Sequence, residues 1–275
     1  MSKLLYANFS RLKKDIIFKI VMAVMFLLGV IICISNYMDI VRYDDIVKFD
    51  NIFFGSIGYI GVLIAAFSSM FVGTEYSDGI IRNKIVIGHR RSDIYLSNFW
   101  VCTLAGVLSN LCYTLVVCII GIPLFGFLET SFSMLLVLYI DCILLIVAYS
   151  AIFNLVAMLI SNKAHATIIS MLLIFVALIT AAIIFGMLAA PEFISPVTIT
   201  VDGQMVDNSV PNPRYLTGIK RNIIQTIQDI LPTGQSLQIA GINVKNPGWM
   251  AMYSIIIASL INVIGIFCFR RKNLK

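Results

Sequence analysis

The chain has 275 residues, of which 60% are apolar and 12% are charged. A soluble domain carries about twice that share of charge, so this chain cannot cover itself with polar surface, and an ordinary soluble fold is excluded. The net charge of +6 does not argue for nucleic-acid binding, because the basic residues gather in segments expected on one side of a membrane.

Six apolar stretches are long enough to cross a hydrocarbon core of about 30 Å as helices. We predict spans near residues 16–37, 52–72, 99–121, 134–160, 167–189 and 249–269. The first stretch follows basic residues, as a signal peptide would, but it is too long and lacks a small-residue cleavage pattern, so we expect a retained span. The expected fold class is all-α, a polytopic membrane protein with six transmembrane helices in one domain over residues 1–275.

The distribution of lysine and arginine predicts the orientation. Thirteen of them fall in the N-terminal segment, the second and fourth loops and the C-terminal tail, and six fall in the other loops. Cytoplasmic segments retain positive charge. We therefore expect a multi-pass protein of the cell membrane with both termini in the cytoplasm and residues 190–248 forming a large extracellular loop.

The loop between the second and third predicted spans, residues 73–97, looks like a short amphipathic helix beneath the membrane. Thr74 can cap a helix whose first turn holds Glu75 and Asp78, where negative charge suits the helix dipole. Isoleucines then alternate with basic and polar residues up to Gly88, which supplies a stop.

The residues of this loop resemble those of a known family. The run Glu75-Tyr76-Ser77-Asp78-Gly79, followed by Gly88-His89-Arg90-Arg91 and Tyr95-Leu96, resembles the cytoplasmic signature of type 2 ABC-transporter permeases, including the peptide-immunity and bacitracin-type permeases. Span count, orientation, size and a long last outer loop containing Leu231-Pro232 fit the same family. His89 stands where the family usually has serine.

The resemblance implies that residues 73–97 form a coupling helix received by a cleft in a separate ATP-binding subunit. The residues that would serve this coupling are Glu75, Tyr76, Asp78, Gly79, Ile80, Arg82, Gly88 and Arg91. Anchoring to lipid headgroups is a competing use of the basic residues, and both roles can hold at once.

The sequence contains no G-x-x-x-x-G-K-[ST] run, so we expect no ATPase site of its own. It also lacks H-E-x-x-H and G-x-S-x-G, which argues against an intramembrane metalloprotease or serine hydrolase. We therefore expect a transport subunit and not an enzyme, with no cofactor bound by this chain and with ATP and Mg²⁺ used by the partner ATPase.

Asp141 is the single acidic residue inside a predicted span. Such a carboxylate should face protein or water and not lipid. It is a candidate for the translocation path, as a substrate contact, a proton or ion site or a gating group. A hydrogen-bonded aspartate joining two helices, or one shallow enough to reach the outer interface, is the structural alternative.

The 190–248 loop is expected to be partly structured. Residues 197–201 and 204–206 flank Asp202-Gly203 and predict a hairpin. Isoleucines at helical spacing from Ile219 to Ile230 predict an amphipathic helix that ends at Pro232. Lying flat on the outer surface, this helix would cap an exit route or anchor the loop.

The combined expectation is the permease subunit of an ABC transporter that exports or extracts an amphipathic peptide or a lipid-like compound. Expected partners are two copies of a P-loop ATPase subunit, a second permease copy or a sister permease, and membrane lipid, with no nucleic acid. A sodium or small-solute ABC exporter and a membrane scaffold without cargo are the alternatives.

Overall fold

The computed structural model of the chain describes residues 1–43, 47–194, 197–199, 205–207 and 210–273. It is 84% helical, and six of its helices are long and apolar enough to cross a membrane. The chain is therefore a nearly all-α, multi-pass membrane protein, as the hydropathy pattern predicts.

Each membrane-length helix contains one of the predicted spans. These helices are α2 (Ile16–Tyr43), the short α3 (Phe49–Phe54) continued by α4 (Ser56–Ser77), α6 (Arg91–Phe125), α7 (Phe132–Leu159), α8 (Lys163–Ala189) and α11 (Pro247–Arg271). The largest difference from prediction is at α6, which begins eight residues early. Asp93 in its first turn suits the positive end of the helix, so the polar residues before the apolar run are already helical.

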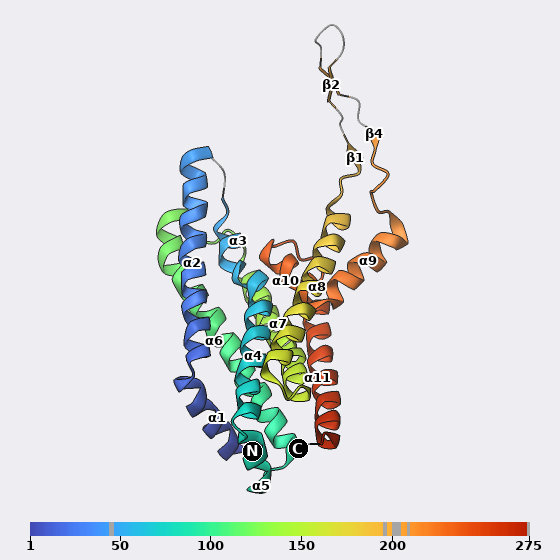
Figure 1. Cartoon of the computed structure of the whole chain (residues 1–275). Helices are drawn as coiled ribbons and strands as arrows, with labels where there is room; N and C mark the ends of the chain where they lie inside the picture. The colour runs from blue at the N-terminus through green and yellow to red at the C-terminus, as the bar shows by residue number, and fades with distance from the viewer. Residues whose placement is uncertain (44–46, 195–196, 200–204, 208–209, 274–275) are drawn as a thin grey trace.

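Both termini lie at the same end of the bundle (Figure 1). We call this end the terminal face, and the opposite one the far end. The terminal face also carries α5 (Ile80–Val86) and α1 (Ser2–Lys14). Hydropathy alone does not predict α1, which packs against α6 and buries Leu4, Asn8 and Leu12. These residues recur every four positions and so share one side of the helix.

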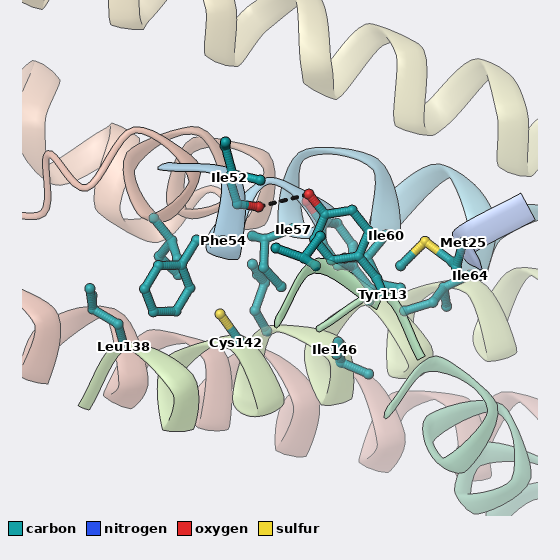
Figure 2. Close-up of a cluster of buried hydrophobic side chains, with 14 of the residues drawn as sticks. Met25, Ile52, Phe54, Ile57, Ile60, Ile64, Tyr113, Leu138, Cys142 and Ile146 are labelled. Carbon is teal, nitrogen blue, oxygen red and sulfur yellow. Dashed lines mark hydrogen bonds between the residues drawn. The ribbon is translucent and has the colours of Figure 1, made fainter. Parts of the chain in front are cut away.

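The middle of the bundle is formed by α4 and α7, which pack against each other and against most of the other spans. A cluster of buried side chains from α2, α3, α4, α6 and α7 joins them (Figure 2). The residues labelled there are Met25, Ile52, Phe54, Ile57, Ile60, Ile64, Tyr113, Leu138, Cys142 and Ile146. Packing of this kind, and not exclusion of water, holds helices together in lipid.

Two glycines of α4 let helices of this chain approach closely. A Cβ at Gly61 would come within 2.9 Å of Tyr149 on α7, and a Cβ at Gly73 would come within 2.9 Å of Lys163 on α8. At these two positions the absence of a side chain therefore serves packing within the subunit.

The segment between α8 and α11 begins with short strands that extend beyond the helices (Figure 1). Strand β2 (Val197–Ile199) pairs antiparallel with β3 (Met205–Asp207), and β1 (Phe193–Ile194) pairs with β4 (Val210–Pro211). The predicted hairpin is confirmed, whereas its Asp202-Gly203 turn lies outside the described residues.

The predicted amphipathic helix is α9 (Gly218–Ile230), but its expected orientation flat on an outer surface is wrong. Arg221 near its start donates to the Leu188 carbonyl at the far end of α8, at 3.0 Å. Thr233, in the first turn of α10 (Pro232–Ala240), donates to the carbonyl of Ala177, midway along α8, at 2.9 Å. The α9–α10 pair therefore descends beside α8 into the bundle, and Pro232 begins the returning helix.

This descent has a physical reason in the sequence. The polar side of α9 and α10 carries Gln and Asp side chains that bond to one another and to α11, so the pair can bury these polar groups. Gln228, which is buried without a side-chain partner among the described residues, is an exception. Apolar residues of α9 remain on the outside, where lipid suits them.

Candidate functional site

The loop that resembles the coupling signature does not begin where the sequence predicts. Thr74 lies inside α4 and does not cap a new helix; its hydroxyl donates to the Met70 carbonyl at 2.8 Å. The helix breaks at Gly79, which adopts a left-handed conformation with φ of +68°. Only glycine enters that region at little cost, so Gly79 and not Thr74 sets the start of α5. Gly88, at φ of +98°, ends the turn after α5 as predicted.

Glu75 is fully buried at the centre of a polar cluster. Its Oε1 accepts from Arg11 at 2.7 Å and from Lys84 at 2.5 Å, and its Oε2 accepts from Asn98 at 2.8 Å. Asn8 completes this Glu75 cluster, because its carbonyl accepts from Lys84 at 2.9 Å and its amide donates to Asn98 at 2.7 Å.

The members of the Glu75 cluster come from four helices. Arg11 and Asn8 lie on α1, Glu75 on α4, Lys84 on α5 and Asn98 on α6. A buried carboxylate is tolerated when cations and donors satisfy it, and losing one partner is then costly. The cluster therefore joins α5 to three other helices, α1, α4 and α6.

A second set of contacts ties the C-terminal tail to the same face. The Tyr76 hydroxyl donates to the Met158 carbonyl at the end of α7, and Lys272 donates to both groups, at 2.9 Å and 3.0 Å. Arg91 donates to the carbonyls of Arg270 at 3.0 Å and Lys272 at 2.6 Å, which covers free acceptors at the end of α11. Burial lowers the pKa of Lys272 to about 8.

The outer surface of the loop remains free of such contacts. Val86 is 80% exposed and Ile87 is 76% exposed, next to the exposed Arg82 and Asn83. We call these four residues the α5 tip. Two exposed aliphatic side chains lie beside one charged and one polar side chain, on a short helix that the bundle contacts on its other side. Such a surface is suited to a protein partner.

A shallow hollow of about 700 Å³ opens beside this loop, where the end of α4 meets the start of α8. Ser77, Asn162, Lys163 and Thr167 are among the residues that line it. The terminal face is therefore uneven, with the projecting α5 tip and a recess next to it.

The predicted coupling residues fall into two groups. Glu75, Tyr76 and Arg91 contact other parts of this chain, whereas Asp78, Arg82 and Gly88 are exposed and Gly79 and Ile80 are half-buried. The first group can act only by holding the loop in place, and the second is accessible to a partner.

The motif did not reveal Asn8, Arg11 and Asn98 as members of the site. A signal for them was present: Glu75 at the end of an apolar span needs cationic or amide partners, and α1 places Asn8 on its apolar side. The sequence could not show which basic residue, from which helix, would fill that need.

Asp141 does not belong to this site. It lies on the far-end half of α7, 17 residues and so about 25 Å along the axis from Met158. Its side chain is 3% exposed, and its Oδ2 has no hydrogen-bond partner among the described residues. The structure thus agrees with a carboxylate turned away from lipid and leaves one acceptor free.

Within the described part of the chain, no group of three or more His, Cys, Asp or Glu side chains is placed to hold a metal ion. Comparison of the chain with protein-family models and with curated proteins found no match. The assignment of a function therefore rests on the loop motif, the terminal-face geometry and the membrane fold.

Proposed function

We propose that this chain is the membrane-spanning permease subunit of an ABC transporter, driven by separate P-loop ATPase subunits that dock on the terminal face. The observation that carries the proposal is the construction of α5. Its tip is exposed, while Lys84 behind it is locked to Glu75 and thereby to three further helices.

This arrangement suits the transfer of mechanical force. A conformational change in a docked ATPase reaches the bundle only through a body that contacts both, and α5 with the Glu75 cluster is such a body. ATP and Mg²⁺ would be bound by the partner, and this chain would have no ATPase site. A second permease copy or a sister permease would complete the translocation path.

The orientation that follows has the terminal face, with both termini and α5, in the cytoplasm of a cell-membrane protein. Thirteen of the lysines and arginines lie in segments assigned to that side, which supports this orientation. The same charges would attract anionic headgroups of the inner leaflet.

Export or extraction of an amphipathic peptide or a lipid-like compound is the transport activity we propose. Exposed apolar residues on the descending α9, including Ile219, Ile223 and Ile227, place an amphipathic surface at the far end of the bundle. An amphiphile leaving the membrane would meet this surface.

A sodium or small-solute exporter is the second candidate, and one observation favours it. The free Oδ2 of the buried Asp141 is an acceptor that a cation or a polar solute could use. Hard cations usually take six or more oxygen ligands, so a lone carboxylate oxygen supports this candidate less strongly. Asp141→Asn should abolish transport if Asp141 binds cargo, and unchanged transport with unchanged pH dependence would remove it from the mechanism.

The proposal is tested with the chain reconstituted in lipid vesicles, with and without a P-loop ATPase subunit encoded beside it. The chain alone should hydrolyse no ATP, and the complex should hydrolyse it and move cargo. Ile87→Asp should reduce co-purification of the ATPase by at least tenfold. Ile219→Asp is a matched control, because Ile219 is 78% exposed but lies at the start of α9, towards the far end.

Equal co-purification in the Ile87 and Ile219 variants would contradict docking at the α5 tip. Transport by the purified chain with no ATPase present would contradict the proposal as a whole. A complex that forms but never hydrolyses ATP in response to any cargo would favour the scaffold alternative.

A further inference from the structure

Asp229, near the end of α9, is another buried carboxylate, with an environment unlike that of Glu75. It is 3% exposed. Its Oδ1 accepts from the amides of Gln225 and Gln238, both at 2.9 Å, and its Oδ2 is 3.4 Å from the Asn246 amide. Three elements thus direct neutral donors at this carboxylate.

Across the described residues, no Lys, Arg or His nitrogen lies within 4.0 Å of the Asp229 carboxylate. A buried carboxylate normally has a charged partner, because amide hydrogen bonds lower the cost of burying the charge without cancelling it. Among the described residues, the Asp229 carboxylate therefore has only neutral hydrogen-bond partners.

The Asp229 carboxylate borders a hollow of about 180 Å³ between α9 and α11. The hollow is lined by Thr226, Asp229, Asn246, Trp249 and Tyr253. The rings of Trp249 and Tyr253 have centroids 6.2 Å apart and are inclined by 31°. A carboxylate together with aromatic rings is the combination that attracts organic cations, because the ring face is negative and the cation is weakly hydrated.

We propose that this hollow binds the ammonium group of an amphiphilic amine. Its volume is below the roughly 300–1,000 Å³ of pockets for drug-sized ligands, so it admits a headgroup and not a whole molecule. The cation would lie between the Asp229 carboxylate and the two rings.

Exposed apolar side chains on the two helices that border the hollow can contact the alkyl chain of such a molecule. Ile227 and Ile230 on α9 and Ile255 and Ile256 on α11 are all at least 42% exposed. An alkyl chain attached to the bound ammonium group would extend over these side chains, in the position that lipid or detergent otherwise occupies. The inference is independent of the proposed transport function, because binding needs no ATPase.

Two kinds of ligand share this chemistry: an aminophospholipid headgroup and a free amphiphilic amine.

The chain allows a direct measurement of binding by fluorescence, because it has only two tryptophans, Trp100 and Trp249. Trp100→Phe leaves Trp249 as the single fluorescent reporter inside the hollow. The protein is held in dodecyl maltoside micelles and titrated with hexyltrimethylammonium, and with hexyl glucoside as the neutral probe of equal chain length.

We expect a saturable change in Trp249 fluorescence with the cationic probe and none with the neutral one. Adding Asp229→Asn should weaken binding by at least tenfold. Glu192→Gln should leave it unchanged, because Glu192 is an exposed carboxylate with no side-chain hydrogen bond among the described residues. Tyr253→Leu, which leaves every hydrogen bond of Asp229 in place, should weaken binding several-fold even if Asp229→Asn fails to fold.

Phosphatidylethanolamine in the micelles distinguishes the two kinds of ligand. If it raises the apparent Kd of the probe, the site takes the lipid headgroup, and if the Kd is unchanged, the site takes free amines. Equal responses to the cationic and neutral probes, no saturable response in the Trp100→Phe protein, or unaltered binding in folded Asp229→Asn and Tyr253→Leu proteins would each overturn the proposal.

Discussion

The terminal face and the α9–α10 region each bury a carboxylate, and they satisfy it in different ways. At the terminal face, Glu75 accepts from two cations and one amide, drawn from α1, α5 and α6. Towards the far end, Asp229 accepts only from neutral amides. The first arrangement gives the carboxylate two cationic partners and ties four helices together, whereas the second leaves the carboxylate with neutral partners beside a hollow.

Under the proposed function, the two arrangements suit two tasks, the transfer of force and the binding of a ligand. A cluster that transmits force should have all its polar groups paired within the protein, because any other partner would compete with those contacts. A site that binds a ligand needs polar or charged groups that the protein itself leaves without a strong partner. Each prediction below tests one side of this comparison, from the largest expected effect to the smallest.

Glu75→Ala should be the most damaging single change, because it leaves Arg11 and Lys84 without their shared anion. Removing one partner of a buried ionic cluster costs about 3–5 kcal/mol in the free energy of unfolding. Thermal unfolding in detergent measures the loss. Asp78→Ala serves as control: this neighbouring exposed carboxylate makes no side-chain hydrogen bond among the described residues, so the change should cost less than about 0.5 kcal/mol. Equal effects of the two variants would mean that the Glu75 cluster does not hold the loop.

Asp229→Asn should lower the free energy of unfolding by about 1–2 kcal/mol, which is less than the effect of Glu75→Ala. The reason is that the change turns charge-assisted hydrogen bonds into neutral ones and leaves no cation without its anion. Thermal unfolding in detergent measures this loss as well. The quantity to compare is the loss of unfolding free energy in Asp229→Asn relative to that in Glu75→Ala. A loss at Asp229 as large as that at Glu75 would contradict the contrast between the two regions.

Gly79→Ala should destabilise the protein by about 1 kcal/mol, because a side chain with Cβ is disfavoured at positive φ even where there is space for it. Gly186→Ala is the matched control. Gly186 also has nothing within 4 Å of an added Cβ, but it lies within helix α8, where alanine is preferred to glycine. Stability should be unchanged or slightly raised there, and if both variants behave alike, the left-handed turn before α5 is not a constraint.

Lys272 should produce the smallest effect, visible only as a pH dependence, because its side chain is half-exposed and solvent screens its charge. Its pKa is about 8 in the folded chain and 10.5 in the unfolded one, so the unfolded chain binds more protons between these values. Stability should therefore rise with pH from about 8 to 10.5 because the half-buried amine no longer has to carry charge. The unfolding free energy of the wild type and of Lys272→Met is measured across this pH range. The slope of unfolding free energy against pH should be smaller in the variant, and the difference between the two slopes is the contribution of Lys272. An identical slope would place Lys272 in free solvent.

The six spans could be predicted from sequence because a continuous apolar run of about 20 residues is a sufficient signal for a membrane helix. The start of α5 could not be placed, because Thr74 and Gly79 both have the character of a helix boundary, and the choice depends on α4 continuing through Ser77. The packing of the helices around α4 settles it.

The Glu75 cluster shows a different reason why part of the site could not be predicted from the sequence. Glu75 and Arg91 could be singled out by their loop motif, but Asn8 and Asn98 are 90 residues apart and meet only because α1 packs on α6. The descent of α9 was missed for a similar reason. Its amphipathic spacing is the same for a helix that lies on a surface and for one that lies against α8, and only the bonds of Arg221 and Thr233 distinguish them.

The central claim is that a separate ATPase contacts the α5 tip, and photo-crosslinking in living cells tests it most directly. A benzophenone amino acid placed at position 87 should crosslink to a P-loop ATPase subunit, whereas the same group at position 219 should not. If the benzophenone at position 87 yields no crosslinked protein, the α5 tip is not a docking surface for an ATPase and the account is wrong. The same conclusion holds if a cysteine placed at position 87 is labelled from outside intact cells by a membrane-impermeant thiol reagent.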